Sequence, residues 1–147
     1  MELNTLLDVM ERVLDGSHAA VLSTVDAQGR PHSRWMVPAV LRGQPGSLYA
    51  VTSPHFAKIE HIAAQPRVSW LIQSKSLDEI VEVTGKAQVI DNPALKVDVL
   101  EALGGNLSTF WHVNSDETDL VVLETAVETV TYFQPNKGER SSASATV

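Results

Sequence analysis

The N-terminal segment places its apolar residues at intervals of three and four positions. These residues are Leu6, Leu7, Met10, Val13 and Leu14. Such spacing builds one apolar stripe along a helix. The pattern therefore predicts a helix over residues 5–15, which Asn4 or Thr5 can cap and Gly16 can end.

From residue 18 onward, apolar and polar positions alternate, as they do in half-buried strands. Polar turns at residues 26–29 and 42–46 separate the first three strands, so these strands are expected to form an antiparallel meander. Gly29 can supply the positive φ of a tight turn, Gly85 indicates a bulge or bend, and Pro38 indicates a nearby sheet edge or bulge. The predicted strands cover residues 18–25, 31–37, 47–52, 67–73, 79–90 and 120–133, the last as one bent strand or two.

Two further helices are expected between the strands. Ser53 followed by Pro54 is typical of a capped helix start, and Pro66 ends that helix. Another helix is expected from Pro93 to about residue 103, with Asp91 or Asn92 as its cap.

The sequence thus predicts a mainly β, α+β domain over residues 1–133, with about six antiparallel strands and about three peripheral helices. Closure of the sheet into a barrel removes exposed strand edges. Residues 107–117 show no clear pattern and are expected to form a loop or irregular helix. Residues 134–147 are rich in small and polar residues and are expected to form a flexible C-terminal tail.

The composition narrows the class of protein. The 147 residues suit one domain. Cysteine is absent, which excludes disulfides, thiol catalysis and thiolate metal sites and fits the reducing cytoplasm as the expected location. The net charge of −7 argues against nucleic acid or an anionic membrane as a partner. Neither a signal peptide nor an apolar run of roughly 18 residues is found, so no membrane span is expected.

Positive charge is concentrated between residues 27 and 77, despite the negative total. In that segment Glu60 is the one acidic residue, against Arg30, Arg34, Arg42, Lys58, Arg67 and Lys75. The strand that ends in Thr52 and Ser53 leads into a helix bearing Lys58, and Arg34 lies on a neighbouring strand. Two hydroxyls, a helix start and two cations together predict a site for a phosphate. The alternative is that Ser53 only caps the helix while Lys58 is solvated.

Trp35 and Met36 follow Arg34 directly. An aromatic ring and a thioether beside an anion clamp can pack against a flat ligand ring, although both are also common core residues. The five histidines show no metal-ligand spacing, so no metal site is expected. Motifs of nucleophilic catalysis and glycine-rich nucleotide loops are also absent, and the catalytic residues stay unassigned.

Five segments occur in the order and spacing of a known family. They cover residues 25–34, 48–53, 58–62, 65–69 and 83–87. Together they resemble the pyridoxamine 5′-phosphate oxidase-like, FMN-binding split-barrel superfamily, and more closely its short general-stress-protein branch. The resemblance extends over roughly residues 5–133.

The resemblance implies a homodimer of split β-barrels with one FMN in each of two clefts between the subunits. It assigns to the cofactor Arg34 and Lys58 at the phosphate, the hydroxyl pair Thr52 and Ser53, and the strand residues Trp35 and Met36 along the flavin. We further expect Trp111, with His112, to close the cleft from the second subunit.

The chain departs from the oxidase proper at several positions. Ala57 replaces a second basic residue before the phosphate lysine, Ala39 replaces a lysine that holds the substrate phosphate, and Ile80 replaces a glutamine at the flavin. The end of the chain also lacks the Arg-Leu-His-type substrate motif. The resemblance therefore implies a flavin-dependent oxidoreductase that acts on an unknown small molecule or electron donor. The departures from the oxidase proper argue against vitamin B6 oxidation. The alternatives are a deazaflavin F420-dependent reductase, a non-catalytic flavin-binding stress-response protein, and a dimeric interaction domain without a cofactor.

Overall fold

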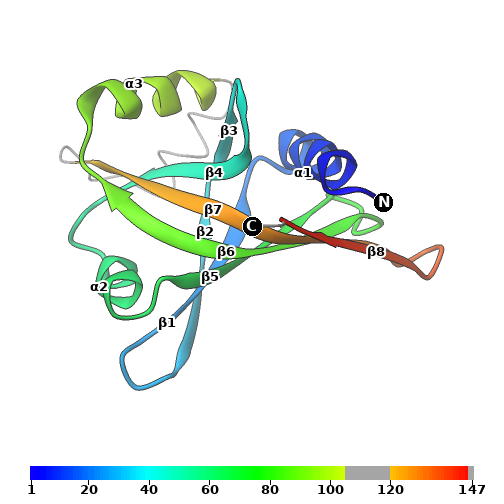
Figure 1. Ribbon diagram of the computed structural model, residues 1–147, viewed down its shortest axis with the longest axis horizontal. Helices are drawn as coiled ribbons and strands as arrows, with labels where there is room; N and C mark the ends of the chain where they lie inside the picture. The colour runs from blue at the N-terminus through cyan, green and yellow to red at the C-terminus, as the bar shows by residue number, and fades with distance from the viewer. Residues whose placement is uncertain (105–119, 146–147) are drawn as a thin grey trace.

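The computed structural model describes residues 1–104 and 120–145, which form three helices and eight strands (Figure 1). In chain order the elements are α1 (Leu3–Ser17), β1 (Ala20–Val25), β2 (Pro31–Met36), β3 (Ala39–Leu41), β4 (Gln44–Thr52), α2 (Ala57–Ala64), β5 (Arg67–Gln73), β6 (Ile80–Ile90), α3 (Pro93–Ala102), β7 (Val121–Gln134) and β8 (Glu139–Ser144). The predicted class, a mainly β, α+β split barrel, is confirmed.

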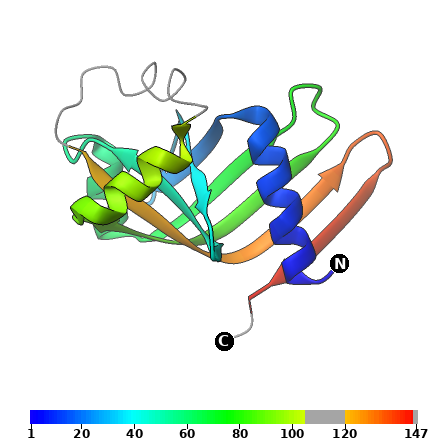
Figure 2. The same ribbon diagram turned by 90° about the horizontal axis from the view of Figure 1, so that it is seen from above.

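All eight strands belong to one antiparallel sheet. The strand order is β2-β1-β5-β6-β7-β4-β3, and β8 pairs with β7 beyond the stretch that β4 covers. Strands β2 and β3 lie at opposite ends of this order, yet only residues 37 and 38 join them. Because so short a link cannot span a flat sheet of this width, the sheet must curve into a half-barrel (Figure 2). The expected sheet edge beside Pro38 is confirmed.

Helix α1 packs the predicted apolar stripe against one face of the sheet, which we call the inner face (Figure 2). The side chain of Trp70 lies at the centre of this core and is fully buried. Its indole N–H donates a 2.9 Å hydrogen bond to Thr125 Oγ1, so the polar atom of the ring is satisfied inside the core.

Helix α3 covers part of the opposite face, which we call the outer face. It packs over β3, β4 and β7 and forms a second, smaller core. The side chains of this core include Tyr49, Val51, Val99, Leu103 and Val122. The Asn92 carboxamide oxygen caps α3 by accepting the N–H groups of Ala94 and Leu95, as the sequence predicts.

The predicted bulge at Gly85 is confirmed, since the pairing of β6 with β7 shifts between Thr84 and Gly85. A Cβ atom at Gly85 would lie 2.1 Å from the carbonyl oxygen of Ala126. No residue other than glycine fits this contact without movement of the backbone. The close approach allows the long β6–β7 ribbon to bend.

Four elements differ from the prediction. Helix α1 has Glu2 at its N-cap position instead of Asn4 or Thr5, and it continues past Gly16 to Ser17 with His18 as its C-cap. The turn at Ser53 precedes α2 instead of starting it, because Ser53 Oγ accepts the N–H of His55 and the helix begins at Ala57. Strand β3 is too short to leave a pattern of its own. Residues 139–144 form β8 on the edge of β7, so this part of the chain is a strand and not the expected tail.

Candidate functional site

Strand β2 presents its residues alternately to the two faces of the sheet. Arg34 lies opposite Leu22 of β1, and Met36 lies opposite Ala20, which places both side chains on the inner face. Trp35 lies opposite Val21 on the outer face, where its side chain is 55 % exposed. The structure thus separates Trp35 from the other two predicted side chains.

The guanidinium of Arg34 is partly shielded from solvent. Its Nη1 donates to the carbonyl oxygen of Leu22 at 3.2 Å. Burial lowers the pKa of Arg34 from its ordinary value, but arginine stays charged at any physiological pH. Within residues 1–104 and 120–145, Arg34 makes no ion pair with a carboxylate. Because Arg34 donates to a backbone carbonyl and pairs with no carboxylate of the described residues, its guanidinium is suited to binding an anion.

Lys58 and the hydroxyl pair lie where β4 leads into α2. The side chains of Thr52 and Ser53 are fully buried, and Lys58 is only 6 % exposed. Lys58 Nζ donates to Thr52 Oγ1 at 3.1 Å and lies 4.2 Å from the centre of the Phe56 ring. Burial of an ammonium group is costly unless polar or π partners surround it, so this corner is built to hold positive charge.

Two histidines adjoin these cations, and the sequence did not single them out. His61 lies one turn after Lys58 on the same face of α2. Its ring centre is 4.5 Å from that of His32, which lies two residues before Arg34 on β2. The signals that could have found them are these spacings, i+3 on a helix and i+2 on a strand. Neither spacing indicates a contact by itself, because the two histidines meet only where β2 of the hairpin lies beside α2.

The carboxylate of Asp26 closes this group at the tip of the β1–β2 hairpin. It accepts bonds from His32 Nε2, Arg30 Nε and two backbone N–H groups. These bonds, His32 first, hold the pKa of Asp26 well below its usual range. Among the described residues, no group of three or more His, Cys, Asp or Glu side chains is arranged to hold a metal ion.

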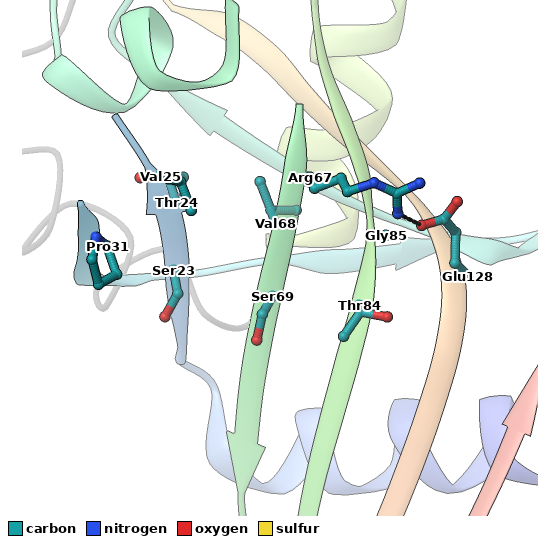
Figure 3. Close-up of a pocket in the computed structure, with 10 residues that line it drawn as sticks. All are labelled: Ser23, Thr24, Val25, Pro31, Arg67, Val68, Ser69, Thr84, Gly85 and Glu128. Carbon is teal, nitrogen blue, oxygen red and sulfur yellow. Dashed lines mark hydrogen bonds and ion pairs between the residues drawn. The ribbon is translucent and has the colours of Figure 1, made fainter. Parts of the chain in front are cut away.

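The outer face carries a separate pocket of about 320 Å³ over β1, β5 and β6 (Figure 3). Ser23, Ser69 and Thr84 lie side by side along it, and an Arg67–Glu128 ion pair of 2.8 Å lies at one end. This pocket includes none of the predicted cofactor residues. The predicted residue Trp111 lies outside the described part of the chain.

The fold and the site define a class: a small split-barrel protein with an internal cationic corner suited to a phosphate. The chain belongs to the family described as pyridoxamine 5′-phosphate oxidase, whose model matches residues 6–134. In the part of the chain that the structure covers, no helix is both long and apolar enough to cross a membrane.

Individual relatives are distant. The pyridoxine/pyridoxamine 5′-phosphate oxidase of Pseudomonas entomophila (strain L48) is 32% identical over 74 residues, which are 50% of this chain but only 34% of that protein. General Stress Protein 26 from Bacillus anthracis str. Sterne superposes with a TM-score of 0.68 at 24% identity, covering 92% of this chain and 97% of that one. A pyridoxamine 5′-phosphate oxidase-related, FMN binding protein from Nostoc punctiforme PCC 73102 superposes with a TM-score of 0.65 at 15% identity, covering 95% and 96%. Because the identities are as low as 24% and 15%, the two solved structures show only that this chain shares their fold.

Proposed function

We propose that the chain binds FMN and is a flavin-dependent oxidoreductase acting on a small molecule. Arg34 and Lys58 would hold the phosphate, with the hydroxyls of Thr52 and Ser53 beside it. Bound FMN would supply hydride and electron transfer, for which the protein provides binding and orientation. The observation that carries the proposal is the shielding of two cations, from β2 and α2, on the inner side of one half-barrel.

The donor set of this corner fits a phosphate. A guanidinium, an ammonium and two hydroxyls offer charged and neutral donors to several phosphate oxygens. Family membership supports a flavin nucleotide as the source of that phosphate, and the Nostoc punctiforme protein of the same fold is described as FMN-binding. Trp35 and Met36 stay predicted flavin contacts; because they point to opposite faces, a ligand that touches both must extend around the free edge of β2.

The phosphate contacts can be tested by titration of FMN into the purified protein, followed by flavin fluorescence. Arg34→Ala and Lys58→Ala should each weaken FMN binding by about 1–3 kcal/mol, the range of a lost charge-assisted hydrogen bond. Arg42→Ala and Lys75→Ala are matched controls, since both remove an exposed cation elsewhere. Wild-type affinity in both test variants would remove this corner from the cofactor site.

We also propose that two copies of the chain pair through the outer face of β1, β2 and β5. On that face Trp35, Val21 and Leu71 form one row across the three strands. Trp35 is 55 % exposed and Leu71 is 39 % exposed, while the next row consists of the uncharged Ser33, Ser23 and Ser69. A face without net charge can meet its own copy without repulsion, and exposed apolar rows of this kind mark interfaces.

Sedimentation tests the pairing. Wild type should sediment as a dimer of twice 16.0 kDa, and Trp35→Glu and Leu71→Glu should shift it to monomer. Val97→Glu is the control, because Val97 is 52 % exposed on α3, which packs over β3, β4 and β7 rather than over these three strands. A monomeric wild type that binds FMN would contradict a cofactor cleft between subunits.

The oxidoreductase assignment needs turnover. FMN-loaded protein should oxidise NADH or NADPH when an electron acceptor is supplied. An FMN-bound protein that turns over neither donor would support a non-catalytic flavin-binding role, whereas binding of F420 in place of FMN would support the deazaflavin alternative.

A further inference from the structure

Five side chains connect the tip of the β1–β2 hairpin to α2. Arg30 Nε and His32 Nε2 each lie 2.9 Å from the same carboxylate oxygen of Asp26. The His32 ring then lies 4.5 Å from the His61 ring, with the planes tilted by 33°. His61 Nδ1 completes the chain with a 2.9 Å hydrogen bond to Thr24 Oγ1, which is fully buried.

This chain adjoins the cationic corner. Arg34 follows His32 by two residues on the same face of β2, a separation of about 7 Å along the strand. Lys58 precedes His61 by one helical turn. His61 therefore lies near both residues proposed to hold the phosphate.

Without an anion, the surroundings of His61 disfavour its protonated form. Burial, then His32 and Arg34 on β2, lower the pKa of His61, while Asp26 and Glu60 act in the opposite direction. Lys58 on the same face of α2 adds a further positive charge nearby. A dianionic phosphate placed between Arg34 and Lys58 would offset these charges and so favour protonation of the neighbouring imidazole.

The hydrogen bond to Thr24 is compatible with both forms of His61. A threonine hydroxyl can donate to an unprotonated Nδ1 or accept from a protonated one, so protonation needs only rotation of the hydroxyl. The contacts between the hairpin and α2 can thus be kept while the pair gains a proton.

We propose that the His32–His61 pair couples phosphate binding to proton uptake, so that protonation of His61 strengthens the binding of the ligand at the Arg34–Lys58 corner between a pH of about 8 and 6. The inference rests on the proposed FMN site. Its physical basis is reciprocal linkage: if the anion favours the imidazolium, the imidazolium must favour the anion by the same factor.

Calorimetric titration of FMN near neutral pH, in two buffers of different ionisation enthalpy, measures the protons taken up on binding. The wild type should take up about half a proton more than His61→Gln. The FMN phosphate has its own pKa of about 6 and would release protons on binding to cations, but this release is common to both proteins and cancels in the comparison. The affinity ratio of wild type to His61→Gln should rise about threefold to tenfold between pH 8 and 6.

His55→Gln is the matched control, because His55 is exposed in the turn before α2 and is not among the described hydrogen-bond or ring partners of His32 and His61. It should keep the proton uptake of the wild type. Riboflavin, which has no phosphate, should bind the wild type without this uptake. Where His61→Gln fails to fold, net uptake by the wild type with FMN but not with riboflavin still supports the inference, because proton release from the phosphate can only lower the measured uptake.

Two results would overturn the inference, and they differ in what else they overturn. The first is FMN binding with equal proton exchange in wild type and His61→Gln, or with an affinity ratio that falls on acidification. This result removes the coupling but leaves the FMN site in place. An absence of FMN binding at every pH removes both.

Discussion

Gly85→Ala tests whether the bend of the β6–β7 ribbon depends on a backbone contact that excludes every side chain. The added Cβ would lie 2.1 Å from the carbonyl oxygen of Ala126 and 3.0 Å from its carbonyl carbon. Both atoms belong to the backbone, so no rotamer change relieves the clash. The strands must separate by about 1 Å or more to reach an ordinary C···O contact of about 3.3 Å.

The expected loss of stability follows from this geometry. Overpacking of a well-packed site costs about 1–3 kcal/mol, and distortion of the adjacent ladder weakens hydrogen bonds worth about 1 kcal/mol each. We expect Gly85→Ala to lower the free energy of unfolding by about 3 kcal/mol. For a domain of this length that corresponds to a fall in Tm of about 10 °C.

Urea unfolding at fixed protein concentration measures the effect, with circular dichroism as the signal. Gly16→Ala serves as the control: an added Cβ there meets nothing within 4 Å, and alanine in a helix is favoured over glycine by up to about 1 kcal/mol. The control should be as stable as wild type or more so. A Gly85→Ala variant within about 0.5 kcal/mol of wild type would refute the contact as the reason for glycine.

Three further effects are expected. Trp70→Phe should lower the free energy of unfolding in denaturant by about 2 kcal/mol, because it leaves the buried Thr125 hydroxyl without its 2.9 Å donor. The double variant with Thr125→Val should lose less stability than the sum of the losses in the two single variants. Asn92→Ala should lower the Tm through loss of about 1 kcal/mol of capping energy, whereas Asn92→Asp should retain most of it. Burial holds the pKa of His61 below the ordinary value of 6.5, so below that pH the unfolded chain binds more protons than the folded one. Stability should therefore fall as the pH drops from 6.5 toward the folded pKa, and His61→Gln should flatten this dependence in a pH series of melts.

Elements that carry their own pattern could be predicted from the sequence. Strand β5 alternates buried residues with partly or fully exposed ones over Arg67–Gln73, with the predicted bounds. The stripe of α1 and the cap of α3 are equally local features. The bulge at Gly85 could be predicted because a glycine inside a strand pattern commonly marks a bulge, a bend or a close backbone approach.

Strand β8 could not be predicted because its cause lies elsewhere in the chain. Residues Glu139–Ser144 have no apolar alternation of their own. They form a strand because β7 extends past the end of β4 and leaves one edge open for pairing. Local composition indicates a tail, whereas the free edge of a distant strand decides the outcome.

The phosphate corner could be predicted in part. The choice of Arg34, Thr52, Ser53 and Lys58 follows from residue type and order, but the geometry of the turn before α2 does not. The roles of His32 and His61 depend on contacts between the hairpin and the helix, which no spacing within either element specifies.

The alternation of β2 explains how one short segment can serve two purposes. Arg34 and Trp35 are neighbours in sequence, yet the register with β1 sends the guanidinium to the inner corner and the indole to the outer face. The sequence of β2 cannot fix this choice, because polar residues occur on both of its faces and leave the register open. With this register, Arg34→Ala should weaken FMN binding at any protein concentration, whereas Trp35→Glu should act first on the association of subunits. Equal effects of the two changes on both properties would mean that the two side chains share one surface, and the different roles given to the two faces of β2 would have to be abandoned.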